Sequence, residues 1–216
     1  MTEQTPEPAP AVTLGASAAN GKHHQKAEEI YRAAAQIFFE KGYHATSINE
    51  IADAVHLTKA GLYYYIRGKQ DLLFGIMTYA MDLIEERVIR PANDISDPLE
   101  RVAGIVSAHA SFIVHESSAL NILVNELQGL NAENRTQITA RQKTYLDFIR
   151  EALREVESST GRKVVDPTVG AFGLLGMILW ISRWYQPGGR LSDDQVVREI
   201  TSMATAAIFR PSDTTP

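Results

Sequence analysis

Segment 46–73 concentrates the side chains of this sequence that suit contact with DNA. A side chain that enters the major groove needs donors for base edges and phosphates, and small neighbours that let the backbone come close. Thr58 can cap a helix on which Leu62 and Ile66, four positions apart, point inward. The remaining faces carry the donors and the small residues. We therefore predict DNA contacts from Thr46, Ser47, Thr58, Lys59, Ala60, Gly61, Tyr63, Tyr64, Tyr65 and Lys69.

A short helix is expected just before this one. Ser47 and Glu50 form a capping box, and a buried face follows at helical spacing, made of Ile48, Ile51, Ala52 and Val55. Two short helices joined by a tight turn have the form of a helix-turn-helix. The three consecutive tyrosines could instead be packing residues, but only one or two of three successive helical positions can face a core. At least one hydroxyl is therefore expected in solvent beside Lys59.

These residue types, at these offsets, resemble the DNA-binding signature of TetR-type bacterial transcriptional regulators. The matching residues are Ile51-Ala52, Leu57-Thr58-Lys59, Leu62-Tyr63 and Lys69-x-x-Leu72-Leu73, within a match over roughly residues 24–73. The resemblance implies an all-α fold with a three-helix DNA-binding domain, residues 23–68, and a larger helical domain for ligand binding and dimerisation, residues 69–210. His56 stands where the family usually has glycine, and histidine is among the residues that tolerate a positive φ.

Composition excludes several classes of protein. The chain has 216 residues and no cysteine, so disulfides, thiolate metal sites and thiol redox sensing are absent. Residues 1–22 are interpreted as a disordered tail, with no positive charge or long apolar core before Lys22 to suggest a secretory signal. The net charge is −5, but residues 22–69 hold seven Lys/Arg against five acids. A net positive charge is thus found only in the predicted DNA-binding segment, as expected of a cytoplasmic DNA-binding protein.

The sequence pattern predicts helices in the rest of the chain, and no segment has a β-strand pattern of comparable strength. A scaffold helix is predicted over Glu28–Lys41, ending at Gly42, and a long connecting helix from about Gln70 to Arg90, closed by Pro91. Further helices are expected from Asp97-Pro98 toward Glu116, over about 119–130, 133–157 and 166–187, and from Asp193 to Phe209.

The stretch from Val169 to Ser182 contains no charge. It is shorter than the about 20 apolar residues of a membrane span, so we expect it to be buried in protein and predict no contact with a membrane. Glycine recurs in it every three residues, which favours close helix contact. In the resembling family the last two helices form a four-helix bundle across the dimer axis; the alternative is a core helix within one chain. The predicted interface consists of Gly170, Gly173, Gly176, Ile200, Met203 and Ala207.

A second group of residues suits a small-molecule effector. Trp180 and Trp184 lie one helical turn apart with Arg183 beside them, where it can meet a carboxylate or phosphate. This stretch is similar to TetR-type regulators of fatty-acid and steroid breakdown, several of which respond to acyl-CoA thioesters. A tryptophan pair at helical spacing more often belongs to a core or an interface than to a ligand site. The predicted ligand-binding residues are His109, Phe112, Phe148, Trp180, Arg183 and Trp184, of which His109 has the alternative of a hydrogen-bonded core histidine.

The sequence therefore predicts a ligand-responsive transcriptional repressor that binds palindromic operator DNA as a homodimer. Its effector would be an acyl-CoA or another hydrophobic metabolite. The alternatives are a helical enzyme and a constitutive architectural DNA-binding protein. No H-E-x-x-H, G-x-S-x-G or phosphate-loop motif supports an enzyme. His23 and His24 could bind a metal or a phosphate, but histidines at the edge of a tail are usually solvated, so neither a metal site nor a cofactor is predicted.

Overall fold

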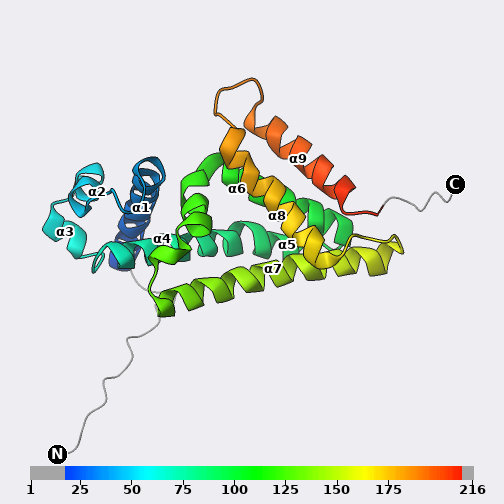
Figure 1. Ribbon diagram of the computed structural model, residues 1–216, viewed down its shortest axis with the longest axis horizontal. Coiled ribbons are helices and arrows are strands. Elements are labelled where there is room, and N and C mark those ends of the chain that lie inside the picture. Colours follow the sequence, from blue (N-terminus) through cyan, green and yellow to red (C-terminus); the bar gives the residue numbers. More distant parts are fainter. Residues whose placement is uncertain (1–17, 211–216) are drawn as a thin grey trace, which may run out of the picture.

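The computed structural model describes residues 18–210, in which the regular elements are all helical (Figure 1). This confirms the all-α prediction. An isolated antiparallel bridge joins Val164 to Phe209. The elements are α1 (Ala18–Lys41), α2 (Ile48–Ala54), α3 (Lys59–Tyr63), α4 (Lys69–Ile84), the π-helix η1 (Glu85–Ile89), α5 (Arg90–Asn93), α6 (Pro98–Asn125), the 3₁₀-helix η2 (Leu127–Gly129), α7 (Ala132–Thr160), α8 (Pro167–Trp184) and α9 (Asp193–Ala207).

The N-terminal helix is longer than the sequence analysis expected. α1 begins at Ala18, well before Glu28, so residues 18–22 are helical where a tail was predicted. The added turns, residues 18–27, contain three alanines and two lysines and lack proline, which allows the helix to extend. Residues 1–17 of the predicted tail lie outside the described residues.

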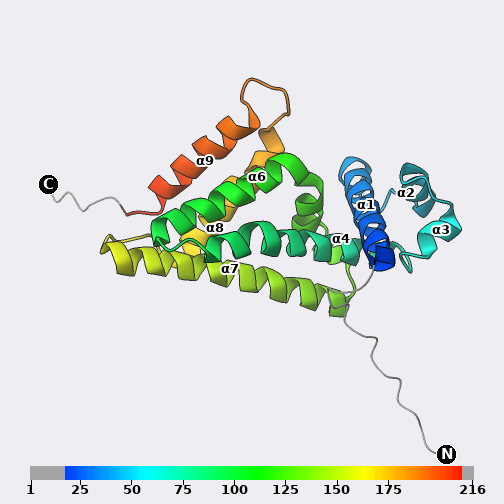
Figure 2. The same cartoon turned by 180° about the vertical axis from the view of Figure 1, so that it is seen from behind.

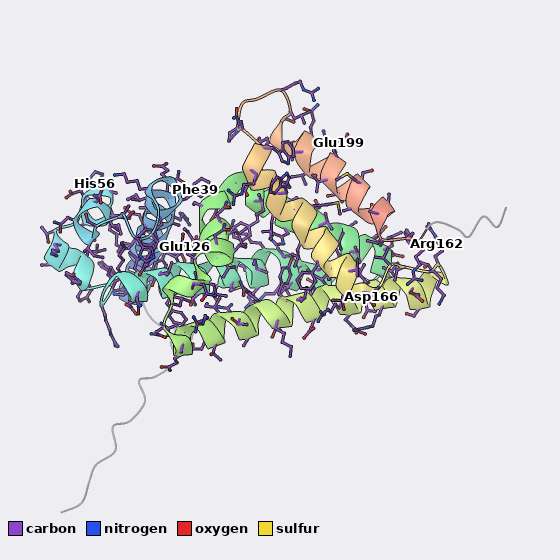
Figure 3. The ribbon with its side chains drawn as sticks, in the orientation of Figure 1. Phe39, His56, Glu126, Arg162, Asp166 and Glu199 are labelled. Carbon is purple, nitrogen blue, oxygen red and sulfur yellow. The ribbon has the colours of Figure 1, made fainter. Side chains whose placement is uncertain are left out.

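The helix-turn-helix forms as the capping residues predict. Ser47 accepts a hydrogen bond from the amide of Glu50, whose carboxylate accepts one from the amide of Ser47, and α2 begins there. Thr58 caps α3 by accepting from the amide of Gly61. Between the two helices His56 has a φ of 55°, the left-handed conformation expected where the family has glycine. Figure 3 shows His56 at one end of the molecule and Arg162 at the other.

The connecting helix does not stop at Pro91. The chain continues from α4 through η1 into α5, which contains Pro91 in its first turn. In η1 the amide of Arg90 donates to the carbonyl of Glu85, five residues back. This wider π turn comes immediately before the proline, where the ring would otherwise crowd the preceding turn, so the predicted helix end at Arg90 is wrong.

Helix α6 is the central helix of the larger domain and packs against α1, α4, α7, α8 and α9 (Figure 2). Its backbone breaks at Glu116, with φ −137° and ψ 46°, which is where the sequence predicts one helix to end. The second part ends at Asn125, short of the predicted Leu130, and η2 follows. One face of its first part is buried throughout, and its members are Val102, Ile105, Val106, His109, Phe112 and Ile113.

Candidate DNA-binding and effector sites

The recognition helix α3 exposes polar and small side chains on its outer side and buries apolar side chains on its inner side. Leu62 and Ile66 are buried against the core of the three-helix unit. Lys59 and Ala60 are exposed in the first turn, and Gly61 is half-buried. Because alanine and glycine add little bulk beside Lys59, this end of α3 can approach another surface closely.

The three tyrosines separate into two roles. Tyr64 is 74% exposed and Tyr63 45%, so two hydroxyl-bearing rings face solvent as the spacing required. Tyr65 is half-buried, and its ring lies 4.8 Å from the ring of His23, measured between centroids. His23 also meets the edge of Tyr64, at 5.5 Å. His23 is thus an exposed residue that packs on the tyrosines, a contact that sequence reasoning missed.

Other predicted DNA contacts are engaged within the protein. Thr46 is buried, and its hydroxyl donates to the carbonyl of Gly42. The Lys69 ammonium donates to the carbonyl of His44 at 3.1 Å and lies 4.7 Å from the ring centroid of Tyr43. In this arrangement Thr46 and Lys69 hold the loop after α1 rather than projecting freely, because the loop carbonyls already accept their hydrogen bonds.

Polar contacts also fix α2 against α1. Lys41 donates to Glu50 at 2.7 Å. Together with the Ser47 amide and hydroxyl, it lowers the pKa of the Glu50 carboxyl to about 2. Lys26 donates to the carbonyl of Val55 at the end of α2, at 3.0 Å. Sequence reasoning did not single out Lys26, because nothing in its local pattern shows that it reaches a helix end 29 residues away.

A groove between α6 and α8 contains two of the predicted effector residues. Trp180 and Arg183 line it together with the polar side chains of Asn121 and Ser182, and its volume is about 150 Å³. The hydroxyl of Ser182 donates to the Asn121 side-chain oxygen at 3.4 Å. The remaining lining is mainly apolar: Ile113, Leu120, Val124, Asn125 and Leu179.

The other predicted effector residues do not line this groove. Phe112 is buried and Phe148 is partly buried against the core, while Trp184 is 45% exposed. Phe112, Phe148 and Trp184 line neither this groove nor the smaller cavity beneath η1. The helical period explains this, since Phe112 faces inward whereas Trp184 sits on the outer side of α8.

His109 lies deep in the larger domain. Its Nδ1 atom is 2.9 Å from the Tyr145 hydroxyl, and both residues are buried. Burial lowers the pKa of His109 to about 4 and raises that of Tyr145. Tyr145 also lines a cavity of about 100 Å³ beneath η1, with Met81, Glu85, Ile89, Arg141 and Thr144.

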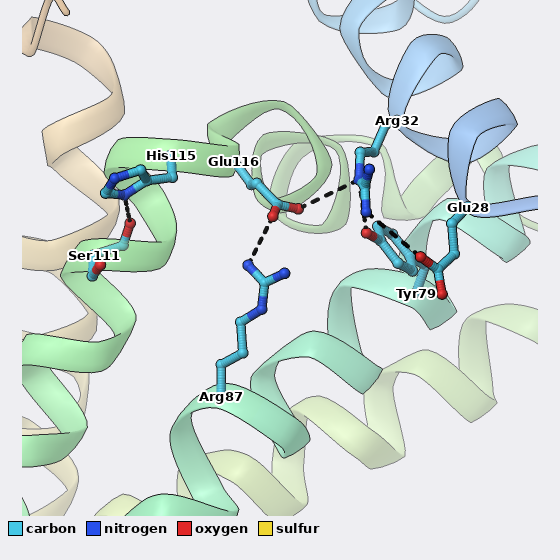
Figure 4. Close-up of polar contacts among 7 residues, drawn as sticks. All are labelled: Glu28, Arg32, Tyr79, Arg87, Ser111, His115 and Glu116. Atoms are coloured by element: carbon cyan, nitrogen blue, oxygen red, sulfur yellow. Dashed lines mark hydrogen bonds and ion pairs between the residues drawn. The ribbon is translucent and has the colours of Figure 1, made fainter. Parts of the chain in front are cut away.

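A charged bridge connects the two domains (Figure 4). Glu116, at the break in α6, pairs with Arg87 of η1 at 2.7 Å and lies 4.0 Å from Nε of Arg32 in α1. Arg32 Nε in turn donates to the hydroxyl of Tyr79 in α4, at 3.0 Å. One carboxylate therefore contacts the scaffold helix of the DNA-binding unit and the π turn of the connecting helix. The same arginine reaches Glu28 at 3.5 Å.

Comparison with known proteins decides the family. Residues 30–76 match the bacterial regulatory proteins of the tetR family, and residues 96–208 match the tetracyclin repressor-like C-terminal domain. The chain belongs to the TetR family. It is a transcriptional regulator and not an enzyme, since the family consists of DNA-binding regulators.

Several characterised TetR proteins are similar along most of the chain. AibR, solved with isovaleryl coenzyme A and operator DNA, is 41% identical, with 82% of this chain and 97% of AibR covered and a TM-score of 0.75. The transcriptional repressor KstR2 of Mycobacterium tuberculosis is 26% identical over 88% of this chain and 96% of KstR2. The fatty acid metabolism regulator of Bacillus subtilis is 25% identical over 69% and 78%.

The last two helices of this TetR protein carry an exposed apolar stripe. Val169, Phe172, Trp180 and Met203 are each more than half exposed. Among the predicted interface residues, Gly173, Gly176 and Ala207 are exposed too, whereas Gly170 and Ile200 are buried. A Cβ on Gly170 would lie 2.8 Å from Leu153, so this glycine allows close packing within the subunit. Gly170 and Ile200 therefore pack within the subunit, and their place at an interface stays a prediction.

Two negative findings concern the described residues. No group of three or more histidine, aspartate and glutamate side chains between residues 18 and 210 is placed to hold a metal ion. None of the helices in the same range combines the length and hydropathy needed to cross a membrane.

Proposed function

We propose that this TetR protein is a homodimeric repressor that binds palindromic operator DNA in the cytoplasm and responds to an acyl-CoA or similar hydrophobic metabolite. The observation that carries the DNA-binding role is the surface of α3. Its exposed residues are Lys59, Ala60, Tyr63 and Tyr64, while Leu62 is buried on the opposite face. Donors and small residues on one short capped helix suit entry into a major groove.

Dimerisation through α8 and α9 is supported by their exposed apolar stripe. Large apolar side chains gathered on one face cost solvation free energy in a monomer, and such patches mark association surfaces. A two-fold dimer would hold two α3 helices, and half-sites one DNA turn apart require a spacing of about 34 to 36 Å. Any change in that spacing would move one helix out of its groove.

An acyl-CoA effector is supported by the groove between α6 and α8 and by the relatives. The groove offers apolar lining for a hydrocarbon, while the exposed Arg183 is a cation for phosphate at its edge. AibR, at 41% identity, has been solved with isovaleryl coenzyme A. Titration of the protein with isovaleryl coenzyme A by calorimetry tests this part of the proposal, and absence of binding by all CoA thioesters would contradict it.

The bridge at Glu116 suggests how effector and DNA are coupled. An effector that shifts α6 or η1 would move a carboxylate that also contacts Arg32 of α1. The position of α1 sets the position of the recognition helix, because α2 packs on α1 and α3 packs on α2. An allosteric effector must make different contacts with the two conformations of the protein, and the shift of this bridge would distinguish them.

Substitution on α3 tests DNA binding. Lys59→Ala and Tyr63→Phe should each weaken binding of the native operator by about ten- to a hundred-fold, because one base or phosphate contact contributes about 1 to 3 kcal/mol. Gel-shift titration at a fixed salt concentration measures the loss. Lys143→Ala, an exposed lysine on α7, is the matched control and should bind as wild type. Wild-type affinity in both α3 variants would show that α3 is not the reading helix.

A further inference from the structure

One nitrogen of His109 is buried without a hydrogen-bond partner. Nδ1 of this histidine faces the hydroxyl of Tyr145 at 2.9 Å, while Nε2 has no partner among the described residues. Burial raises the pKa of Tyr145, so its hydroxyl keeps its proton and can donate it to Nδ1. Burial also keeps the imidazole neutral, and in the tautomer that accepts from Tyr145 its one hydrogen lies on Nε2. In this tautomer the core contains an N–H donor that lacks an acceptor, an arrangement that proteins seldom retain without a use.

Two openings approach this pair. Tyr145 lines the cavity of about 100 Å³ beneath η1. On α6, Ile113 lies one helical turn from His109 on the same face and lines the groove that contains Arg183. The cavity also borders the π-helix, a local widening that is frequent at functional sites. His109 itself lines neither opening; it adjoins the cavity through Tyr145 and the groove through Ile113.

We propose that Nε2 of His109 donates a hydrogen bond to the carbonyl oxygen of the effector's acyl group, and that Tyr145 is a positioning residue that holds the imidazole in the required tautomer. This assignment rests on the proposed acyl-CoA effector. It explains why a polar pair stands in an otherwise apolar interior, because the carbonyl of the ligand supplies the missing acceptor.

The surroundings favour a neutral and short acyl group. A neutral imidazole gives no countercharge to a free carboxylate, and burying an unpaired carboxylate is strongly unfavourable, whereas a thioester carbonyl is uncharged. An engineered cavity of about 150 Å³ takes up benzene, so the about 100 Å³ here suits an acyl chain of about four or five carbon atoms. The recognised feature is therefore the carbonyl of a short-chain acyl thioester.

A pair of probes isolates the carbonyl contact. Isovaleryl coenzyme A and its thioether analogue, S-(3-methylbutyl) coenzyme A, differ only in the presence of that oxygen. Calorimetric titration of the wild-type protein should show about ten-fold tighter binding of the thioester, the effect of one hydrogen bond made in a dry site. His109→Phe, which removes the donor, should bind the two compounds equally. Tyr145→Phe should reduce the preference, because the imidazole then lacks the partner that fixes its tautomer.

Rescue and folding controls complete the test. His109→Gln keeps a side-chain N–H and should restore part of the preference for the thioester. Operator binding by each variant, measured by gel shift, shows that the fold is intact. An unchanged preference in a folded His109→Phe variant overturns the His109 assignment alone. If that variant does not fold, an unchanged preference in Tyr145→Phe overturns it. If the wild type binds neither compound, both this assignment and the proposed acyl-CoA effector are overturned, while the DNA-binding function is unaffected.

Discussion

The burial of His109 bears both on its proposed role in ligand recognition and on the stability of the fold. Burial lowers the pKa of its imidazole to about 4, against an ordinary value near 6.5. The histidine remains neutral in the folded protein at neutral pH, and in the tautomer that accepts from Tyr145 its Nε2 hydrogen has no acceptor among the described residues. A buried donor without an acceptor costs about 1 to 3 kcal/mol.

The same burial predicts a pH dependence of stability. Between pH 6.5 and about 4 the unfolded chain binds a proton at His109 that the folded protein does not bind. The free energy of unfolding should therefore fall as the pH decreases through this window, by about 2 to 3 kcal/mol more in the wild type than in His109→Gln. Urea denaturation at pH 7 and pH 4.5 measures the difference. Parallel pH profiles for the two proteins would contradict a neutral buried histidine.

At the scale of elements, two irregularities in long helices lie next to each other. The π turn η1 carries Arg87, and the break in α6 carries Glu116, and these two residues form an ion pair. Since irregular turns have weaker backbone hydrogen bonding than regular helix, they are the places where α4 and α6 can change direction. Arg32 joins the same carboxylate to α1.

Removing the charge of Glu116 should weaken the coupling between the domains. Glu116→Gln keeps the shape of the side chain but loses both ion pairs, so the effect of isovaleryl coenzyme A on operator affinity should decrease about five-fold or more. Fluorescence anisotropy of labelled operator, with and without the thioester, measures this ratio. Glu151→Gln breaks an exposed ion pair with Arg154 on α7 and should leave the ratio unchanged. If this ratio of operator affinities is unaltered in Glu116→Gln, the Glu116 bridge does not couple effector binding to DNA binding.

The sequence predicted these elements unequally well. Caps such as Ser47 and Thr58 act within one turn, so α2 and α3 were predicted correctly. Pro91 was misjudged, because a π turn that accommodates proline leaves no local signature. The contacts of Lys69 with the loop after α1 and of His109 with Tyr145 join residues far apart in the chain, so no spacing rule could reveal them. The DNA and ligand assignments remain predictions.

At the scale of the whole molecule, α8 and α9 lie on the opposite side of the larger domain from α2 and α3 (Figure 1). Their exposed stripe includes Phe172 and Trp180, with Gly173 and Gly176 exposed between them. Large apolar side chains beside glycines allow two helices to approach closely, which suits a second copy of the chain on a two-fold axis. DNA binding to two half-sites would then depend on this distant surface.

Substitutions at two glycines of α8 distinguish an effect on association from an effect on folding. A Cβ on Gly173 meets nothing within 4 Å in the subunit, whereas a Cβ on Gly170 would lie 2.8 Å from Leu153 and 3.0 Å from Val165. Gly173→Leu should therefore keep the monomer at least as stable, since leucine favours helix over glycine, while it blocks close approach of a partner. Gly170→Leu should instead destabilise the fold.

Sedimentation and thermal unfolding distinguish these outcomes. The wild type should sediment with twice the 23.9 kDa mass of one chain at micromolar concentration, and Gly173→Leu with the mass of a monomer. Gly173→Leu should retain its helical circular dichroism yet lose tight operator binding, because a single α3 contacts only one half-site. A monomeric wild type, or a Gly173→Leu variant that remains a dimer with full operator affinity, would contradict an interface at this part of α8.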